Sequence, residues 1–365
     1  MILMNDFKAE PEELLRQQLV ATERVLRSGW YILGKEVKDF EAAWAQRCGV
    51  SGAVGVANGM DAIEIGFRAL GIGPDDEVIT TPMTAFATVL AIFRVGAKPV
   101  LADIDPGTAL SSMESVARCV SPKTKAVLLV HMYGQMADMS AWAAFCEQHN
   151  ILLLEDCAQA HLAEWDGRVA GSFGAFGAYS FYPTKNLGAM GDAGALVSNE
   201  DALLHRARVI RNYGQSERYH HPEIGLNSRL DELHAAILSE RLKWLDTFTA
   251  QRRAVAATYH AGISSPVLRL LDEPKQKHSH VYHLFVLLCD ERERFSAYLT
   301  EAGIANLAHY PIPVHKQPPC AEVRIDPAGL QVAEQHAKTC LSIPCHPQMS
   351  GSDIARVIEV VNAFK

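Results

Sequence analysis

The sequence predicts an α/β fold: a large domain whose mostly parallel, mixed sheet lies between helices, followed by a smaller C-terminal α+β domain. Between residues 52 and 200, short apolar runs alternate with helical patterns, which is typical of strands joined by crossover helices. Further along, a helical stretch, one strand-like run and another helix follow one another. We therefore expect a large domain over 1–245 and a small domain over 246–365.

Length and composition support this division. The 365 residues exceed one average domain of roughly 150 residues, and 48% hydrophobic with 21% charged residues is ordinary globular usage. The formal net charge of -8 argues against nucleic acid or an anionic membrane as partner. Residues 1–8 lack the pattern of a signal peptide, and no apolar run approaches the roughly 20 residues needed to cross a bilayer, so we expect a cytoplasmic protein.

The elements follow in order along the chain. Residues 11–28 predict an amphipathic helix that ends at a Ser-Gly pair, and residues 30–34 predict an exposed apolar loop. The helical stripe consists of Leu15, Leu19, Thr22 and Leu26. Strands are predicted at 53–57, 77–80, 98–102, 126–131, 151–155, 175–181 and 194–197. A helical stretch around 230–262, a strand-like run at 281–288 and a helix near 292–303 follow, and the Pro-rich stretches 310–313 and 317–319 are interpreted as ordered loops.

The eight cysteines contain no Cys-x-x-Cys pair, so neither a disulfide framework nor a zinc ribbon fits. The nearest approach to a metal cluster is Cys340, Cys345 and His346, which Pro344 and Pro347 hold in a rigid turn. We interpret this stretch as structural and predict no metal.

Active sites on open parallel sheets lie beyond the carboxyl ends of the strands, where this chain places several polar residues. Asp156 follows the run 151–154, which looks buried on both faces, so its carboxylate should be partly desolvated and have a cationic partner. Taken alone, an aspartate at this place is more often a helix cap or a structural ion pair.

Lys185 lies on a tight loop between Pro183 and Gly188, after a strand in which Ser180 and Tyr182 share one face. This loop would hold the lysine stem rigidly beneath the strand ends. An unaccompanied loop lysine is more often a solvated surface charge.

Gly59 ends a strand and opens a helix, where free backbone N–H groups and the helix dipole favour an anion such as a phosphate. The glycines at 171, 174 and 177 precede a strand instead, so we interpret them as turn and packing residues and not as a dinucleotide loop. Each signal is weak by itself. Together, a phosphate cradle, a buried aspartate that can keep a pyridine nitrogen protonated and an imine-forming lysine describe a pyridoxal-phosphate site.

Five motifs of the chain resemble those of the DegT/StrS-type sugar aminotransferases, in order and over almost the whole length. They are Gly55–Ala62, Val130–Gln135, Glu155–His161, Ser180–Gly188 and Gly225–Glu232. Segments 281–285 and 309–317 are most similar to the members that aminate C3 of a dTDP-3-keto-6-deoxyhexose. The resemblance implies an aspartate-aminotransferase-like fold (fold type I), the cofactor pyridoxal 5'-phosphate and L-glutamate as amino donor.

Residue roles also come from this resemblance. It implies that Lys185 binds the cofactor aldehyde, that Asp156 pairs with the pyridine nitrogen, that Gln159 reaches the ring hydroxyl and that Phe86 stacks on the ring. The phosphate would be held by the backbone at Gly59 and Met60, by the Ser180 hydroxyl and by Asn227 of the other subunit, which implies a homodimer with shared sites. The family commonly has Thr or Ser where this chain has Met60, so one side-chain hydroxyl is missing.

Substrate contacts are expected from two places. Arg218 and Tyr219 could reach across the dimer to the diphosphate or base, while Tyr182, His309 and Tyr310 could face the hexose or the cofactor. A packed structural histidine at 309 and a solvated charge at 218 are the alternatives.

Other functions stay open at this point. A dehydratase of the same family has His in place of the imine lysine, so Lys185 argues against it. A 4-keto nucleotide sugar is an alternative acceptor, and a non-catalytic cofactor-binding regulator is an alternative of another class. A nicotinamide oxidoreductase is disfavoured because no glycine fingerprint follows the first strand.

Overall fold

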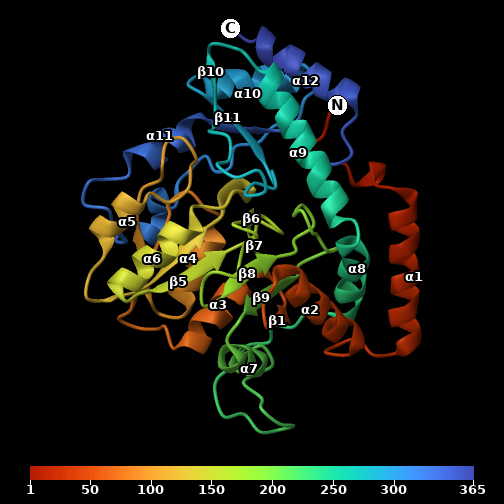
Figure 1. The fold of residues 1–365 in the computed structure, drawn as a ribbon, viewed down its shortest axis with the longest axis vertical. Helices are drawn as coiled ribbons and strands as arrows, with labels where there is room; N and C mark the ends of the chain where they lie inside the picture. Colours follow the sequence, from red (N-terminus) through yellow and green to blue (C-terminus); the bar gives the residue numbers. More distant parts are fainter.

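Eight strands form one mostly parallel sheet in the order β1-β9-β8-β5-β4-β2-β3-β12 (Figure 1). In the computed structural model, which describes residues 1–365, β9 runs antiparallel to both of its neighbours and the other pairs are parallel. The predicted fold class is therefore confirmed. The strands of this sheet are β1 (Gly52–Val56), β2 (Glu77–Thr80), β3 (Lys98–Leu101), β4 (Thr124–Val130), β5 (Leu152–Asp156), β8 (Gly177–Ser180), β9 (Gly194–Ser198) and β12 (Arg324–Ile325).

The remaining elements surround this sheet. A three-stranded sheet contains β10 (Leu268–Leu270), β11 (Phe285–Cys289) and β13 (Cys340–Ile343), and β6 (Glu164–Trp165) pairs with β7 (Arg168–Val169). The helices are α1 (Glu12–Ser28), α2 (Lys35–Cys48), α3 (Gly59–Leu70), α4 (Phe86–Arg94), α5 (Met113–Cys119), α6 (Met139–His149), α7 (Asp201–Ile210), α8 (Glu232–Leu242), α9 (Leu245–Gly262), α10 (Arg292–Glu301), α11 (Gln331–Thr339) and α12 (Gly351–Ala363). Short 3-10 turns are η1 (Phe7–Ala9), η2 (Met132–Gly134), η3 (Val314–Lys316) and η4 (Pro318–Cys320).

Both faces of the large sheet are buried, which explains why its strands read as continuous apolar runs. Successive residues of β4 alternate between two cores: Val127 and Leu129 pack with α2, α5, α6 and α8, whereas Ala126 and Leu128 pack with α3, α4 and α7. The carboxyl ends of the parallel strands thus meet at one edge, between two layers of helices.

A separate core lies at the other end of the molecule, at the top of Figure 1. There α9, α10 and α12 enclose the three-stranded sheet around residues such as Tyr259, Phe295 and Val357. Two segments cross the predicted boundary at 245: Ile2 pairs with Ile304, and β12 adds to the edge of the large sheet beside β3. The division at residue 245 stays a prediction.

Two expectations differ from the structure. The run expected as a strand over 281–288 forms a strand only over Phe285–Cys289, because residues 281–284 leave the sheet and approach the lysine loop. The apolar stripe expected on α1 lies on the exposed face of the helix. Leu19 and Leu26 are each 60% exposed, while Leu14, Ala21 and Val25 are buried. The spacing predicted the helix correctly but not the face that it buries.

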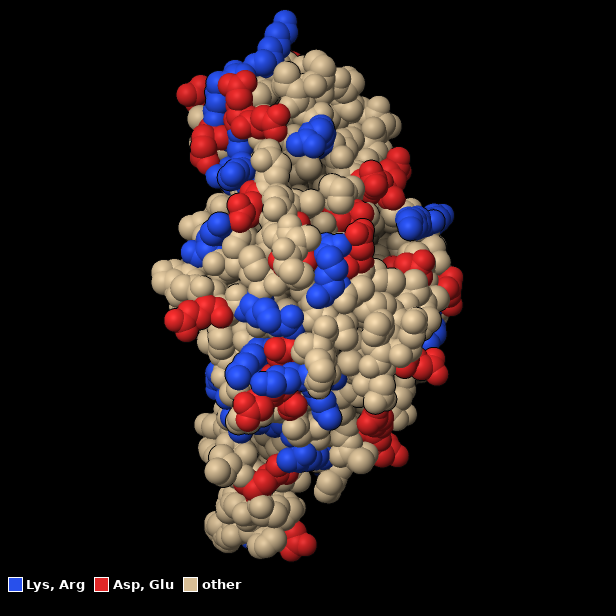
Figure 2. All heavy atoms as spheres, turned by 90° about the vertical axis from the view of Figure 1, so that its left-hand side faces the viewer, with Lys and Arg blue, Asp and Glu red and all other residues tan.

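The surface and the thiols agree with an ordinary globular chain. Basic and acidic side chains are mixed on the face shown in Figure 2. No helix is long and apolar enough to cross a lipid bilayer.

All eight cysteines are buried and unpaired, and burial raises the pKa of Cys48 and Cys146 to about 12, so these thiols are unreactive.

Candidate active site

Asp156 ends β5 at the edge where the parallel strands finish, and its side chain is buried. Its Oδ2 accepts a hydrogen bond from Thr88 Oγ1 at 2.8 Å, and its Oδ1 accepts one from the N–H of Ala158 at 3.1 Å. Burial raises the pKa of this carboxyl, while both hydrogen bonds and the charge of Lys185 act in the opposite direction. No ion pair joins Asp156 to a cation, so the expected cationic partner is replaced within the protein by a hydroxyl and an amide.

Lys185 lies on the loop between β8 and β9, and this loop is held firmly. Its N–H donates to the carbonyl of Tyr182 at 2.9 Å, and the side chain of Asn186 donates to the carbonyl of Val281 at 3.0 Å. The half-buried Nζ forms no hydrogen bond or ion pair, and burial lowers the pKa of Lys185 to about 8 although Asp156 opposes the shift. With that pKa about one amine in ten is neutral at pH 7, the form that attacks an aldehyde.

Three neutral histidines surround this lysine. Burial lowers the pKa of His161 to about 3, that of His309 to about 4 and that of His283 well below its ordinary value, and the charge of Lys185 adds to each shift. His161 donates from Nε2 to the carbonyl of Ser180 at 2.9 Å, while Nδ1 of His283 lies 3.3 Å from Oδ1 of Asn186. Of these three, only His309 had been predicted as a site residue; His161 and His283 lie in segments that the resemblance covers but were given no role.

The predicted phosphate cradle is brought together at the first turn of α3. A Cβ at Gly59 would lie only 2.7 Å from Cβ of Ser180, so only glycine allows this close approach. The Asn58 side chain caps the helix by accepting from the N–H of Asp61, and the first-turn N–H groups have no partner within the helix. Met60 packs against the core on this face of the sheet. Free amides thus lie beside a serine hydroxyl, which suits an anion.

Gln159 connects this region with the segment that carries His309 and Tyr310. Its Oε1 accepts from the N–H of Tyr133 at 2.6 Å, while its Nε2 lies 3.5 Å from the hydroxyl of Tyr310. The amide nitrogen therefore remains available as a donor. Burial raises the pKa of Tyr310 to about 12, so its hydroxyl stays protonated.

Phe86 and Tyr182 form no side-chain hydrogen bond to this group, although the carbonyl of Tyr182 accepts from the N–H of Lys185. Phe86 begins α4 and packs beside Val89 and Val314 at the edge of the sheet, whereas Thr88 of the same helix contacts Asp156. Tyr182 is half exposed.

The remaining three predicted residues lie on the loop between α7 and α8, which projects from the body (Figure 1). Tyr219 is 81% exposed, and the Arg218 guanidinium lies 5.1 Å from the centre of its ring. Neither these residues nor Asn227 form a bond to the group around Lys185.

A buried cluster around Glu155 contains residue types that can bind a metal. Glu155, His131 and Cys157 lie close enough to hold a metal, but both oxygens of Glu155 are occupied. They accept from the N–H groups of Gly171, Phe173 and Gly174 and from the ring of His131. The expected turn glycines at 171 and 174 thus anchor a loop on a buried carboxylate.

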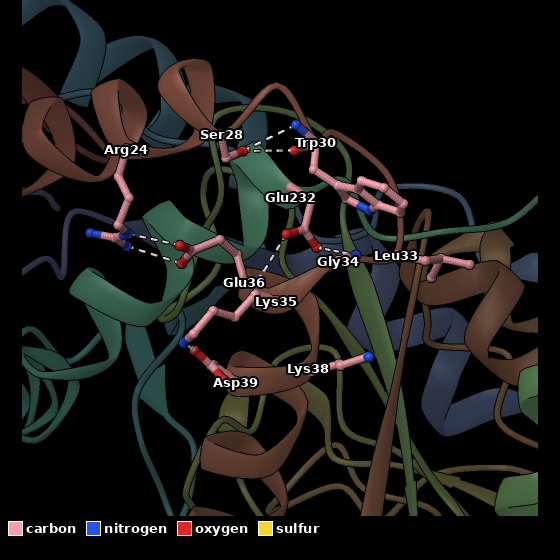
Figure 3. A pocket seen from close by; sticks show the side chains of 10 residues that line it. All are labelled: Arg24, Ser28, Trp30, Leu33, Gly34, Lys35, Glu36, Lys38, Asp39 and Glu232. Atoms are coloured by element: carbon pink, nitrogen blue, oxygen red, sulfur yellow. Dashed lines mark hydrogen bonds and ion pairs between the residues drawn. The ribbon is translucent and has the colours of Figure 1, made fainter.

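A cavity of about 840 Å³ lies beside the apolar loop over 30–34 (Figure 3). Glu232 accepts from the N–H groups of Gly34, Glu36 and Val37, which caps the N-terminus of α2. Trp30 is fixed by a bond from its Nε1 to the carbonyl of Ile32 at 2.8 Å and remains 63% exposed. The end of the motif 225–232 is therefore structural, and the loop beside it is a preformed apolar surface.

The donor set fits pyridoxal phosphate. A buried carboxylate suits a protonated pyridine nitrogen, Nε2 of Gln159 suits the ring hydroxyl, and the first turn of α3 with Ser180 suits the phosphate. An unpaired amine of lowered pKa suits the aldehyde. Sequence reasoning had missed Thr88, although two threonines four residues apart after β2 could have indicated it.

The chain is similar to known aminotransferases over almost its whole length. A family model described as the DegT/DnrJ/EryC1/StrS aminotransferase family matches residues 13–362. A dTDP-3-amino-3,6-dideoxy-alpha-D-galactopyranose transaminase of Aneurinibacillus thermoaerophilus is 44% identical over 94% of either chain. A protein of Geobacillus stearothermophilus named pleiotropic regulatory protein is 42% identical over 99% of this chain and 98% of its own.

Among solved structures, DesV of S. venezuelae in complex with a ketimine intermediate has 40% identity and a TM-score of 0.95, over 99% of this chain and 97% of that one. The expected family, fold and cofactor are thereby confirmed. The chain belongs to the DegT/DnrJ/EryC1/StrS aminotransferase family, whose aminotransferases depend on pyridoxal phosphate.

Proposed function

We propose that this protein transfers an amino group from L-glutamate to C3 of a dTDP-linked 3-keto-6-deoxyhexose. The observation that carries the reaction type is the unpaired, half-buried Lys185 in the same site as the buried Asp156. The choice of a 3-keto sugar is supported by segments 281–285 and 309–317 and by the relative named as a dTDP-3-amino-3,6-dideoxyhexose transaminase.

Asp156 and Lys185 have different roles in the proposed reaction. The bound cofactor supplies an electron sink that stabilises a carbanion at the donor's Cα. Asp156 keeps the ring nitrogen protonated, and Thr88 and Ala158 hold the carboxylate in place. The neutral Nζ of Lys185 would take the proton from the donor's Cα and deliver it to the cofactor carbon that carried the aldehyde, because its lowered pKa lies near the working pH.

The second half of the cycle consumes the keto sugar at the same place. We assign Tyr182, His309 and Tyr310 of the same chain to the hexose. Arg218 and Tyr219 of the other subunit are assigned to the diphosphate or base. Stacking by Phe86 and a phosphate contact from the other subunit's Asn227 belong to the same proposal.

A homodimer is part of the proposal. The stripe Leu15, Leu19 and Leu26 on α1 and the loop Trp30–Ile32 leave a large apolar surface exposed. Such surfaces on a globular chain mark interaction sites. The loop between α7 and α8 exposes a further apolar residue, Ile224, at 86%, and a second copy would cover such residues.

The proposed activity is tested with purified protein, L-glutamate and separate 3-keto and 4-keto dTDP-sugars, followed by mass and NMR analysis of the products. We expect amination at C3. Lys185→Ala should abolish turnover, whereas Lys123→Ala, at an exposed loop, should leave it unchanged. Full activity of the Lys185 variant would contradict the proposed mechanism. A product aminated at C4 would show that the acceptor is a 4-keto sugar and not a 3-keto sugar.

A regulator without catalytic activity is the second candidate, because one relative carries a regulatory name. A protein that binds pyridoxal phosphate, turns yellow and never exchanges amino groups with glutamate would support it. Conversion of the bound cofactor by glutamate alone, seen as loss of the visible absorbance band, would exclude it.

A further inference from the structure

Tyr133 forms a closed ring of hydrogen bonds with three other residues of the site. Its N–H donates to Oε1 of Gln159 at 2.6 Å, and its hydroxyl donates to the carbonyl of His309 at 2.6 Å. The neighbouring Tyr310 closes the ring through its hydroxyl, 3.5 Å from Nε2 of Gln159. A second bond of 2.8 Å joins the Tyr133 hydroxyl to Nε2 of His336 on α11.

This tyrosine is also held in an uncommon conformation. Its φ of 62° lies in the left-handed region, which is strained for a residue with a bulky side chain. The side chain is 2% exposed and stacks on the ring of His336, with centroids 6.0 Å apart. Strain of this kind persists only where surrounding contacts enforce it, and it clusters at functional sites.

The two ends of Tyr133 reach different parts of the site. Its backbone amide fixes Gln159, the residue assigned to the cofactor ring hydroxyl. Its side chain fixes the backbone of the segment that carries His309 and Tyr310, which are assigned to the hexose. The contacts come from η2, from the loop after β5 and from the segment before η3, so they join parts of the chain more than a hundred residues apart.

We propose that Tyr133 is a positioning residue that sets the hexose-binding segment around 309–310 at a fixed place relative to Gln159 and the cofactor. This inference rests on the proposed function of the site. It assigns Tyr133 no contact with the reacting atoms, and its effect passes through the backbone of His309.

The two contacts of Tyr133 can be tested separately, because one uses its hydroxyl and the other its backbone amide. Tyr133→Phe removes the hydroxyl and keeps the backbone amide, the aromatic ring and most of the volume. Gln159 therefore keeps its partner, whereas the 309–310 segment loses one hydrogen bond and His336 loses another. A matched control is Tyr179→Phe, because Tyr179 is equally buried and its hydroxyl donates to a backbone carbonyl, that of Ala170.

The test measures the two half-reactions of the holoenzyme separately. For Tyr133→Phe we expect KM for the keto sugar to rise about tenfold, as expected for one lost hydrogen bond at a positioned segment, while cofactor affinity and the rate with glutamate stay within about twofold. The Tyr179 variant should change neither half-reaction. An unchanged KM, or an equal loss in both half-reactions, would overturn the proposal.

A second measurement keeps the inference independent of the acceptor. Amide hydrogen exchange of the sugar-free holoenzyme should be faster over residues 307–314 in the Tyr133 variant than in wild type or in the Tyr179 variant. Unchanged exchange there would refute the positioning role. Wild-type protein that reacts with glutamate but aminates no keto sugar would refute the proposed acceptor instead, and the exchange result would still decide the role of Tyr133.

Discussion

At the scale of single residues, the chemistry depends on what burial does to two charges. Desolvation raises the pKa of Asp156, and a threonine hydroxyl, an amide and the charge of Lys185 oppose this shift. Desolvation also brings Lys185 toward its neutral form. Asp156 and Lys185 could be predicted from the sequence because each follows a strand. Thr88, His283 and Tyr133 were missed, because their hydrogen-bond partners are distant along the chain, although the pair of threonines after β2 was a signal for Thr88.

Thr88→Val tests the support of the aspartate. The change keeps the shape but removes the hydroxyl donor, so the pKa of Asp156 should rise further and its hold on a protonated ring nitrogen should weaken. The single-turnover rate with glutamate should fall about 10- to 100-fold, because hydrogen bonds to charged groups are worth roughly 1.5–3 kcal/mol. Thr258→Val, whose hydroxyl meets only a helix carbonyl, is the control; an equal rate in both variants contradicts the assignment.

The pH dependence of Lys185 is a second prediction. In cofactor-free protein its reaction with acetic anhydride, followed by mass spectrometry, should rise with pH through a midpoint of about 8, because only the neutral amine reacts. Asp156→Asn removes the anion that favours the ammonium, so the midpoint should move below 8. A midpoint near that of an ordinary lysine, or an upward shift in the variant, would contradict the burial argument.

At the scale of elements, periodicity predicted most of the sheet and its covering helices. Length and pattern suffice there because buried parallel strands carry apolar residues on both faces. Periodicity did not predict which face of α1 is buried, because the exposed leucines of this helix have the same helical spacing as the buried residues. It also missed β12, which is two residues long and owes its place to the edge of β3.

Glu232→Ala tests how the loop over 30–34 is attached to α8. Removing a carboxylate that accepts from three amides leaves the first turn of α2 uncapped, so the free energy of unfolding should fall by about 1–2 kcal/mol. Urea denaturation measures this change. The exposed Glu23, which pairs only with Arg27, should be replaceable by Ala at little cost. Equal stability of both variants would show that the cap contributes nothing.

At the scale of the whole molecule, the proposed site includes residues that one chain does not bring together. Lys185, Asp156 and Gln159 converge, whereas Arg218, Tyr219 and Asn227 lie between α7 and α8 and form no bond to them within one chain. Sequence patterns describe a single chain, so they predict candidate residues of the site but not how two chains of the proposed dimer would share it.

Mixed dimers test this sharing. Lys185→Ala should be inactive, and Asn227→Asp should be nearly so, because it places a carboxylate where the proposal puts a phosphate. After subunit exchange, half of the dimers would combine both chains and contain one intact site of two, so activity should recover to about a quarter of wild type. No recovery after exchange confirmed by mass spectrometry would place Asn227 in its own chain's site.

The burial of every native thiol has a practical consequence. A cysteine introduced at Arg218 would be the one thiol that a maleimide dye reaches, with no need to remove the other eight. In the proposed dimer, fluorophores attached there would report, by energy transfer between the two chains, the distance between the projecting loops as donor and acceptor substrates alternate.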